Sequence, residues 1–240
     1  GGALRLSAVP ERLGLDGLPA DLPPKEPEST DADILWLFDM PAEIRIHQHD
    51  SAHASILIDG DFLYVNTSNG VDNTHRKIRA PGAPSLIVLY KNTGKQLAYD
   101  DERIGPRIFH CTWSSPALGE VNGIRLIYFA GGDGVVYAFD ALRQPPAEPQ
   151  PLKRVWRFDC DPTAPKENVA QFQGNRKISP SNICGMPVFD NGRVYVVAGG
   201  DVWHGKPQAW LKCIDASKSG EITESGQIWS YALSSHSMTT

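Results

Sequence analysis

Hydrophobic and polar positions alternate along this chain in short runs rather than at helical spacing. The clearest example is the run 124–129, which is followed by a Gly/Asp turn at 131–134, an alternating stretch at 135–140 and an aromatic stretch at 154–159. A period of two, bounded by tight turns, is typical of half-buried β-strands. The pattern therefore predicts an all-β protein made of short antiparallel strands.

The same arrangement recurs, which indicates an internal repeat. The turn dipeptides Asp59-Gly60, Asn122-Gly123 and Asn191-Gly192 each precede a run rich in β-branched and aromatic residues. Their spacing of roughly 65 residues is longer than the unit of common propeller repeats, and we assign the extra length to loops. Each unit offers three to four strands, so stacking of neighbouring units is expected to form the core.

An aromatic pair closes most of these units. Trp36, Trp156 and Trp229 each stand two positions before another aromatic residue. A Trp side chain buries up to ~250 Å² and carries a single polar N–H group, which suits it to packing between sheets. We therefore predict that these three residues are structural and dock one unit on the next.

Four-stranded antiparallel units repeated around an axis are the blades of a β-propeller. We predict blades at about 51–101, 110–160 and 181–233, inside a propeller region 34–240. The segment 34–39 is expected to be an outer or closing strand, and residues from 234 onward the opening of another blade. Because closed propellers have ~4 to 8 blades, about three blades with parts of two others predict a partial ring. The remainder of a longer protein, or a second chain, would complete it.

Composition adds an arm and excludes some partners. Residues 1–33 are rich in Pro, Asp and Glu, and such a segment buries too little apolar area to fold alone. We expect it to be an extended arm or linker that docks on a partner or on the body. A net charge of −5 argues against nucleic acid as a partner. No run reaches the ~18 apolar residues that a membrane span needs.

Five segments carry a resemblance to a known family. They are Asp59–Asp72, Ala83–Ile87, Lys91–Lys95, Trp113–Ala117 and Gly131–Gly134. Together they resemble the bacterial PQQ-like β-propeller repeat family, which includes the pyrroloquinoline-quinone (PQQ) dehydrogenases and the outer-membrane assembly lipoprotein BamB. The resemblance implies the propeller fold, the tryptophan-docking role predicted above, and an exported protein of the periplasm or cell surface. Fold alone does not settle function.

The resemblance leaves the activity open between two classes. Catalytic members imply PQQ, a calcium ion held by Glu, Asn and Asp, an Asp base and a pair of adjacent cysteines. The four cysteines here are dispersed, so our leading interpretation is a non-catalytic module without a cofactor, whose partners are other protein subunits or the rest of the propeller. A PQQ- and calcium-dependent oxidoreductase is the alternative. The cysteines stand at Cys111, Cys160, Cys184 and Cys213, where they form disulfides or act as small buried hydrophobes.

Two loops are the expected contact surfaces, because loops on a rigid scaffold carry function. One spans 69–79 and the other contains Trp203-His204. A third function, carbohydrate binding, would depend on exposure of Trp203 and Trp210. The candidate interaction residues are Asn69, Asp72, His75, Trp203 and His204.

Two further patterns have a functional and a structural interpretation. His47, His49 and His53 could share one face of a strand and bind a metal. The alternation around them favours a polar loop or face instead, so no catalytic or metal-binding residue is assigned. The turns Gly131-Gly132-Asp133 and Gly199-Gly200-Asp201 are expected to supply positive backbone dihedrals and a short acceptor rather than a cation site.

Overall fold

The computed structural model describes residues 35–49 and 54–236. It divides the chain into two compact units, Gly1–Phe38 and Asp39–Thr240. The predicted arm 1–33 and His53 lie outside the described residues. So do residues 237–240, which make up most of the segment predicted to open another blade.

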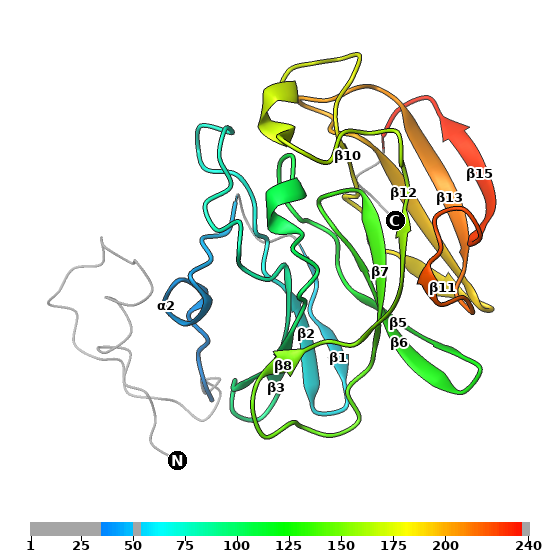
Figure 1. Ribbon diagram of the computed structural model, residues 1–240. Helices are drawn as coiled ribbons and strands as arrows, with labels where there is room; N and C mark the ends of the chain where they lie inside the picture. The colour runs from blue at the N-terminus through cyan, green and yellow to red at the C-terminus, as the bar shows by residue number, and fades with distance from the viewer. Residues whose placement is uncertain (1–34, 50–53, 237–240) are drawn as a thin grey trace, which may run out of the picture. The chain divides into compact units, whose positions relative to one another are not determined.

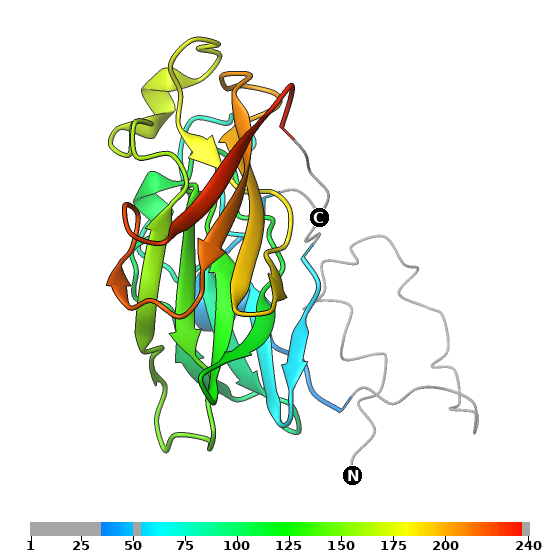
Figure 2. The ribbon, with the colours of Figure 1, turned by 90° about the vertical axis from the view of Figure 1, so that its right-hand side faces the viewer.

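The second unit contains three β-sheets that follow one another in chain order, and Figures 1 and 2 show them side by side. Each sheet has antiparallel main strands, which confirms the predicted all-β fold of blade-like units. The first sheet consists of β1 (Leu57–Asp59), β2 (Phe62–Asn66), β3 (Leu86–Tyr90), β4 (Gln96–Tyr99) and β8 (Gln150–Pro151). The second consists of β5 (Ala117–Val121), β6 (Ile124–Ala130), β7 (Val135–Asp140), β9 (Arg154–Asp159) and β14 (Gly220–Glu221). The third consists of β10 (Ser181–Asn182), β11 (Val188–Asp190), β12 (Arg193–Gly200), β13 (Ala209–Asp215) and β15 (Gln227–Leu233).

The second sheet is buried on both faces. Along β6, Ile127 and Phe129 join the apolar cluster shared with the first sheet, whereas Leu126 and Tyr128 join the cluster shared with the third. Successive strand residues point to opposite faces, so one strand supplies two cores. The continuous hydrophobic run 126–130 therefore reports a sheet held between two neighbours.

Neighbouring sheets are also joined through their outer edges. The short strand β8 comes from the β7–β9 connection but pairs in parallel with β4 of the first sheet. In the same way β14, from the β13–β15 connection, pairs in parallel with β9 of the second sheet. The edge strand of each of these sheets is thereby covered by the following unit, which protects groups that would otherwise be open to pairing.

The predicted docking tryptophans occupy different surroundings. Trp156 in β9 is fully buried, and its indole N–H donates to the Ala216 carbonyl oxygen, at an N···O distance of 3.2 Å. Trp229 in β15 is 38% exposed and contacts Tyr195, with ring centroids 6.0 Å apart. Trp36 lies in the first unit and is half-buried. Trp156 thus contacts the chain segment that follows β13, and the docking role stays a prediction for all three tryptophans.

The prediction of a strand at 34–39 is wrong for residues 35–39, which are the part of it that the structure describes. Residues 35–39 form no strand, and a short helix, α2 (Met40–Ile44), follows at once. Asp39 is its N-cap, because its side chain accepts a hydrogen bond from the Ala42 N–H at 3.1 Å. Pro41 supplies no backbone N–H for a strand ladder but suits the first turn of a helix.

The prediction for the two Gly-Gly-Asp turns is right about the acceptor but wrong about the backbone dihedrals of the glycines. Asp133 and Asp201 are the predicted acceptors of backbone N–H groups. The glycines before them do not have positive φ; instead they stand where there is no room for a side chain. A Cβ on Gly132 would lie 2.5 Å from the Cys111 carbonyl oxygen, and one on Gly200 would lie 2.1 Å from that of Lys206.

All four cysteines are buried free thiols, so the structure favours small buried hydrophobes over disulfides. Within the described residues, no helix is both long enough and apolar enough to span a membrane.

Replacing Trp156 with Ala is expected to lower the free energy of unfolding by about 3 to 5 kcal/mol, since it empties a fully buried site and removes a hydrogen bond. Urea denaturation measures this loss. Trp229→Ala is the matched control in the outer strand of the third sheet, and it is expected to cost clearly less because Trp229 is partly exposed. Equal losses in the two variants would contradict the inter-sheet role of Trp156.

Candidate functional site

Four histidines from separate parts of the chain meet at one place in the second unit. His49 follows α2, His75 lies in the β2–β3 loop, His110 precedes β5 and His204 follows β12. The ring centroids of His49 and His75 are 4.9 Å apart, and the His110 ring lies 4.9 Å from that of His49 and 5.0 Å from that of His75. We call these four residues, together with Asp201, the histidine cluster.

His110 is the centre of the cluster, and both its ring nitrogens have partners. Its Nε2 lies 3.1 Å from Nε2 of His49, and its Nδ1 lies 3.0 Å from Oδ2 of Asp201. All three residues are buried. Backbone hydrogen bonds hold the segment in place, because the Val71 N–H donates to the His110 carbonyl and the Thr112 N–H donates to that of Asn69.

Asp201 is fixed from several directions. Its Oδ1 accepts the backbone N–H groups of Trp203 and His204, while its Oδ2 faces His110 and the side-chain amide of Asn182. Burial alone would raise the pKa of Asp201, but the contacts with His110 and the two backbone N–H groups lower it below its ordinary value. The carboxylate is therefore held ionised beside His110.

The two remaining histidines are less deeply placed. His75 is half-buried, adopts φ 58° and follows a turn in which Asp72 accepts from the Thr74 N–H and hydroxyl. His204 lies with its ring 5.3 Å from that of His75 and 5.2 Å from that of His110. Burial is the main cause that lowers the pKa of His204, so its imidazole is kept neutral at neutral pH.

Two tryptophans flank His110. Trp113 is buried, with its ring centroid 4.8 Å from that of His110, whereas Trp203 is 46% exposed at 5.4 Å. Their rings are also in contact with each other, 5.6 Å between centroids. The cluster therefore has an apolar aromatic wall on one side.

The cluster contains two overlapping sets of residues with the chemistry of metal ligands. In one set, ligand atoms of His49, His75 and His110 all lie within 4.8 Å of one another. In the other, the same is true of His110, Asp201 and His204. Neutral imidazole is the commonest metal ligand among side chains, and a hydrogen-bonded histidine pair is the alternative chemistry of the same geometry.

The structure brings together most of the residues predicted to be contact points. His75, Trp203 and His204 come from the two predicted loops and meet in the cluster, which joins those loops across the first and third sheets. Asp72 shapes the turn before His75, and Asn69 is buried, donating from its side-chain amide to the Ala80 carbonyl.

Of the three histidines considered as a possible metal face, only His49 belongs to the cluster. His47 is exposed, and His53 lies outside the described residues.

Sequence reasoning missed three residues, His110, Asp201 and Trp113. His110 immediately precedes Cys111 and the Trp113–Ala117 segment that carries part of the resemblance, and Asp201 was assigned only to a turn. One signal in the sequence could have indicated Asp201 as a site residue. Gly199-Gly200-Asp201 is followed by a long loop rather than by the short turn of a hairpin, and that loop contains both Trp203 and His204.

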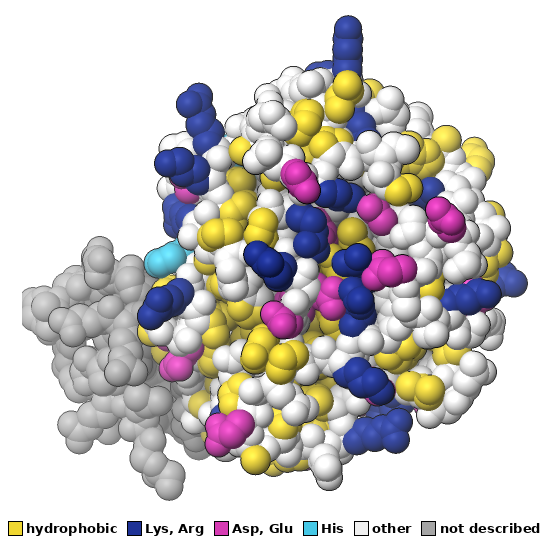
Figure 3. Space-filling model, in the orientation of Figure 1, with side chains coloured by type: hydrophobic (Ala, Val, Ile, Leu, Met, Phe, Trp, Pro, Cys, Tyr) yellow, Lys and Arg dark blue, Asp and Glu magenta, His cyan; other side chains and the backbone are white. Residues whose placement is uncertain are grey.

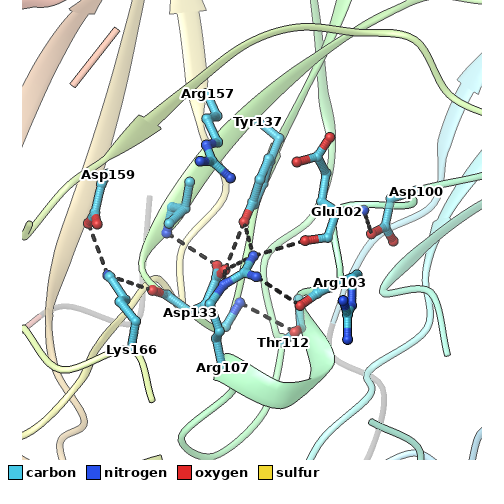
Figure 4. A network of polar contacts seen from close by, with 12 residues as sticks. Asp100, Glu102, Arg103, Arg107, Thr112, Asp133, Tyr137, Arg157, Asp159 and Lys166 are labelled. Carbon is cyan, nitrogen blue, oxygen red and sulfur yellow. Dashed lines mark hydrogen bonds and ion pairs between the residues drawn. The ribbon is translucent and has the colours of Figure 1, made fainter. Parts of the chain in front are cut away.

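The equivalent turn of the second sheet, shown in Figure 4, carries a different network. Asp133 is fully buried and accepts hydrogen bonds from Nε of Arg107, 2.9 Å away, and from the Tyr137 hydroxyl, 2.7 Å away. Lys166 donates to the Asp133 carbonyl and to Asp159. Burial would lower the pKa of Arg107, but the charge of Asp133 and the contact with Tyr137 raise it above its ordinary value. This network is fully paired and is best explained as structural.

Charged side chains of both signs are mixed on the face of the molecule that Figure 3 shows. Figure 3 shows Lys and Arg side chains interspersed with Asp and Glu near the middle of that face. Among the ion pairs near the Asp133 network, Arg154 contacts Glu102 and Lys166 contacts Asp159. Such mixing is unlike the clustered positive charge of a nucleic-acid surface.

A buried ion pair supports the loop that carries Trp203 and His204. The Lys206 ammonium contacts the Asp161 carboxylate, which also accepts from the hydroxyls of Ser181 and Thr163. Lys206 and Asp161 are both buried. The pair therefore ties the loop after β12 to the connection that leaves the second sheet at β9.

No protein-family model matches the chain, and no curated protein matches it by sequence. Among solved structures, the chain is similar to the quinohemoprotein alcohol dehydrogenase of Comamonas testosteroni, at 16% identity and a TM-score of 0.45, over 76% of this chain and 21% of that one. It is also similar to the quinohemoprotein alcohol dehydrogenase ADHIIG of Pseudomonas putida HK5, at 16% identity and a TM-score of 0.44, over 79% of this chain and 22% of that one. Its similarity to BamB of Moraxella catarrhalis has 13% identity and a TM-score of 0.27, over 73% of this chain and 47% of that one. These are the kinds of protein that the sequence resemblance names. The chain spans about a fifth of the length of the two dehydrogenases and under half of BamB.

Asp161→Asn is expected to destabilise the protein at pH 7 by about 3 to 5 kcal/mol, because it leaves the Lys206 ammonium buried without its counter-charge. Burial alone would raise the pKa of Asp161, but its hydrogen bonds from Lys206, Ser181 and Thr163 lower it. A carboxylate with a depressed folded pKa stabilises the protein above its unfolded pKa of ~3.9, and that contribution is lost as the pH falls through the folded pKa. The difference between wild type and variant should therefore be full at pH 7 and shrink below about pH 4.

Urea denaturation at both pH values measures this difference. Asp61→Asn is the control, since its contact with Lys91 is largely exposed and is expected to contribute at most about 1 kcal/mol. If the difference in free energy of unfolding between wild type and Asp161→Asn were the same at both pH values, the stabilising role of the Lys206–Asp161 ion pair would be contradicted.

Proposed function

We propose that this chain is a non-catalytic propeller module that binds a partner protein at the face formed by the histidine cluster and Trp203. One observation carries the proposal. The two loops expected to be contact surfaces, from the first and third sheets, converge on this face and place His75, Trp203 and His204 beside one another. The setting we propose is a larger assembly of the periplasm or cell surface, as the sequence resemblance implies.

The chemistry of the face supports a protein partner. Trp203 is nearly half exposed although its ring packs against His110 and Trp113, so its outer part is available while its inner part is anchored. Trp is enriched at protein interfaces, where it combines a large contact area with little conformational entropy loss. A rigid aromatic residue on a scaffold of sheets is the expected anchor of such an interface.

The outer strand of the third sheet supports further contact with protein. Along β15, Ile228, Trp229 and Tyr231 are exposed, whereas the corresponding outer strand of the second sheet buries Trp156 and Phe158. Exposed apolar groups on a strand are typical of interaction surfaces. This strand is suited to pack against a further sheet of the same kind.

Carbohydrate binding has less support. Trp203 faces the histidine cluster, whereas the Trp210 ring has the ammonium groups of Lys206 and Lys212 each 5.7 Å from its centroid. Trp210 is therefore engaged in cation–π contacts within the protein. The PQQ- and calcium-dependent oxidoreductase remains the alternative from the sequence, and PQQ absorbance after reconstitution of the full-length protein tests it.

Native mass spectrometry of the full-length protein, purified gently from its source, is expected to show a complex rather than a lone monomer. Trp203→Ala should weaken that complex by about 30-fold, the effect of losing an interface anchor worth ~2 kcal/mol. Ile124→Ala alters an exposed apolar residue of β6 and serves as the control. A lone monomer, or equal retention of the partner by the two variants, would reject the proposed face.

A further inference from the structure

We propose that the histidine cluster binds one divalent transition-metal ion, with imidazole nitrogens of His49, His75 and His110 as its ligands and Asp201 as the residue that orients His110. The proposal goes beyond the interaction role and does not depend on it.

The spacing of the ligand atoms suits such an ion. Zn²⁺ binds imidazole nitrogen at ~2.0 to 2.1 Å, which places neighbouring nitrogens of a tetrahedral site roughly 3.3 Å apart. Nε2 of His49 and Nε2 of His110 are 3.1 Å apart, and one ring nitrogen from each of His49, His75 and His110 lies within 4.8 Å of the other two. His75 comes from a loop and is half-buried, so a small inward movement of its side chain completes the set.

Asp201 occupies the position of an orienting carboxylate. Metal-bound histidines usually donate their other ring N–H to a carboxylate or carbonyl oxygen, which fixes the tautomer and the ring orientation. His110 turns Nδ1 to Asp201 and Nε2 to His49, as this arrangement requires. In the competing set of His110, Asp201 and His204, Asp201 would have to bind the ion although its Oδ2 already lies 3.0 Å from Nδ1 of His110. The geometry therefore favours one ion on the Nε2 side.

A histidine pair joined only by a hydrogen bond does not account for the whole cluster. It satisfies the Nε2 atoms of His49 and His110, but the ring nitrogens of His75 and His204 make no hydrogen bond to any described residue. Four imidazole rings with neighbouring centroids about 5 Å apart bring together more nitrogen ligands than one hydrogen bond uses, and a bound cation would use them.

The side chains available as ligands favour a metal ion that prefers nitrogen ligands. Cys111 and Cys184 lie nearby in an apolar cluster with Trp113. Neither cysteine belongs to the two sets of residues whose ligand atoms gather in the cluster, and the Cys111 thiol donates to the Ser68 carbonyl oxygen at 3.4 Å. The proposed site is therefore built of imidazole. Such ligands suit Zn²⁺, Co²⁺, Ni²⁺ and Cu²⁺ rather than Ca²⁺ or Mg²⁺.

The experiment is a titration of the full-length, chelator-treated protein with Zn²⁺ by calorimetry and with Co²⁺ by visible absorption. One ion per chain is expected, with the d–d bands of a nitrogen-ligated Co²⁺ site. His75→Ala should weaken binding by more than about 100-fold, and Asp201→Asn should weaken it by about 10- to 100-fold, the effect of losing an orienting carboxylate.

His47→Ala is the matched control, because His47 is exposed and stands two positions from His49. It should bind the ion like the wild type, and Zn²⁺ should raise the melting temperature of both but not that of His75→Ala. Circular dichroism of the metal-free variants verifies that each is folded, and His75→Ala is the decisive variant because its loop position spares the core. Absence of stoichiometric Zn²⁺ binding, or equal weakening by His47→Ala and His75→Ala, overturns the site. Two ions per chain overturn the orienting role of Asp201.

Discussion

Burial of the second sheet on both faces is the constraint on which the rest of the second unit depends. Leu126 and Tyr128 face the third sheet while Ile127 and Phe129 face the first, so a shift of one residue in register would exchange the two cores. The sheet is therefore fixed relative to both neighbours. This fixes the segment that enters β5, and with it His110, between loops of the first and third sheets.

Buried carboxylates at equivalent turns show how the same backbone device takes two chemical roles. Asp133 and Asp201 both follow a Gly-Gly pair that leaves room for another backbone segment, and both accept nearby N–H groups. Asp133 is matched by the permanent charge of Arg107. Asp201 is matched by His110, whose second ring nitrogen faces His49. The difference between a structural network and a candidate site thus lies in the partner, not in the turn.

The fold could be predicted from sequence because its determinants are local and repeated. Alternation over 135–140 and the turn dipeptides each report a strand or hairpin, and recurrence at a regular interval reports the stacking of units. The error at 35–39 arose where an aromatic pattern was followed by Asp39 and Pro41, whose helix-starting chemistry was stronger than the strand pattern.

The site could be predicted only in part, since it joins residues that no local pattern connects. The two loops containing His75 and Trp203-His204 were identified because long loops on a repeat scaffold carry contacts. That they meet depends on packing of the three sheets, and His110 was hidden because a single histidine before a strand has no pattern of its own. The inner position of His110 becomes visible only when the hydrogen bonds from Val71 and to Asp201 are known.

Within the cluster, the degree of anchoring decides what a ligand could change. His49 is held through its backbone N–H on the Ser68 carbonyl, and His110 is held on both sides of its ring. His75 stands instead on a loop shaped by the Asp72 turn and is the least constrained of the three proposed ligands. Because His49 and His110 are already held in place and only the loop of His75 has to move, binding would lose little conformational entropy. A ligand captured in this way would act on the loop 72–79 and leave the sheets unchanged, so any effect on a partner would be transmitted through the same loop surface that we propose as the contact face.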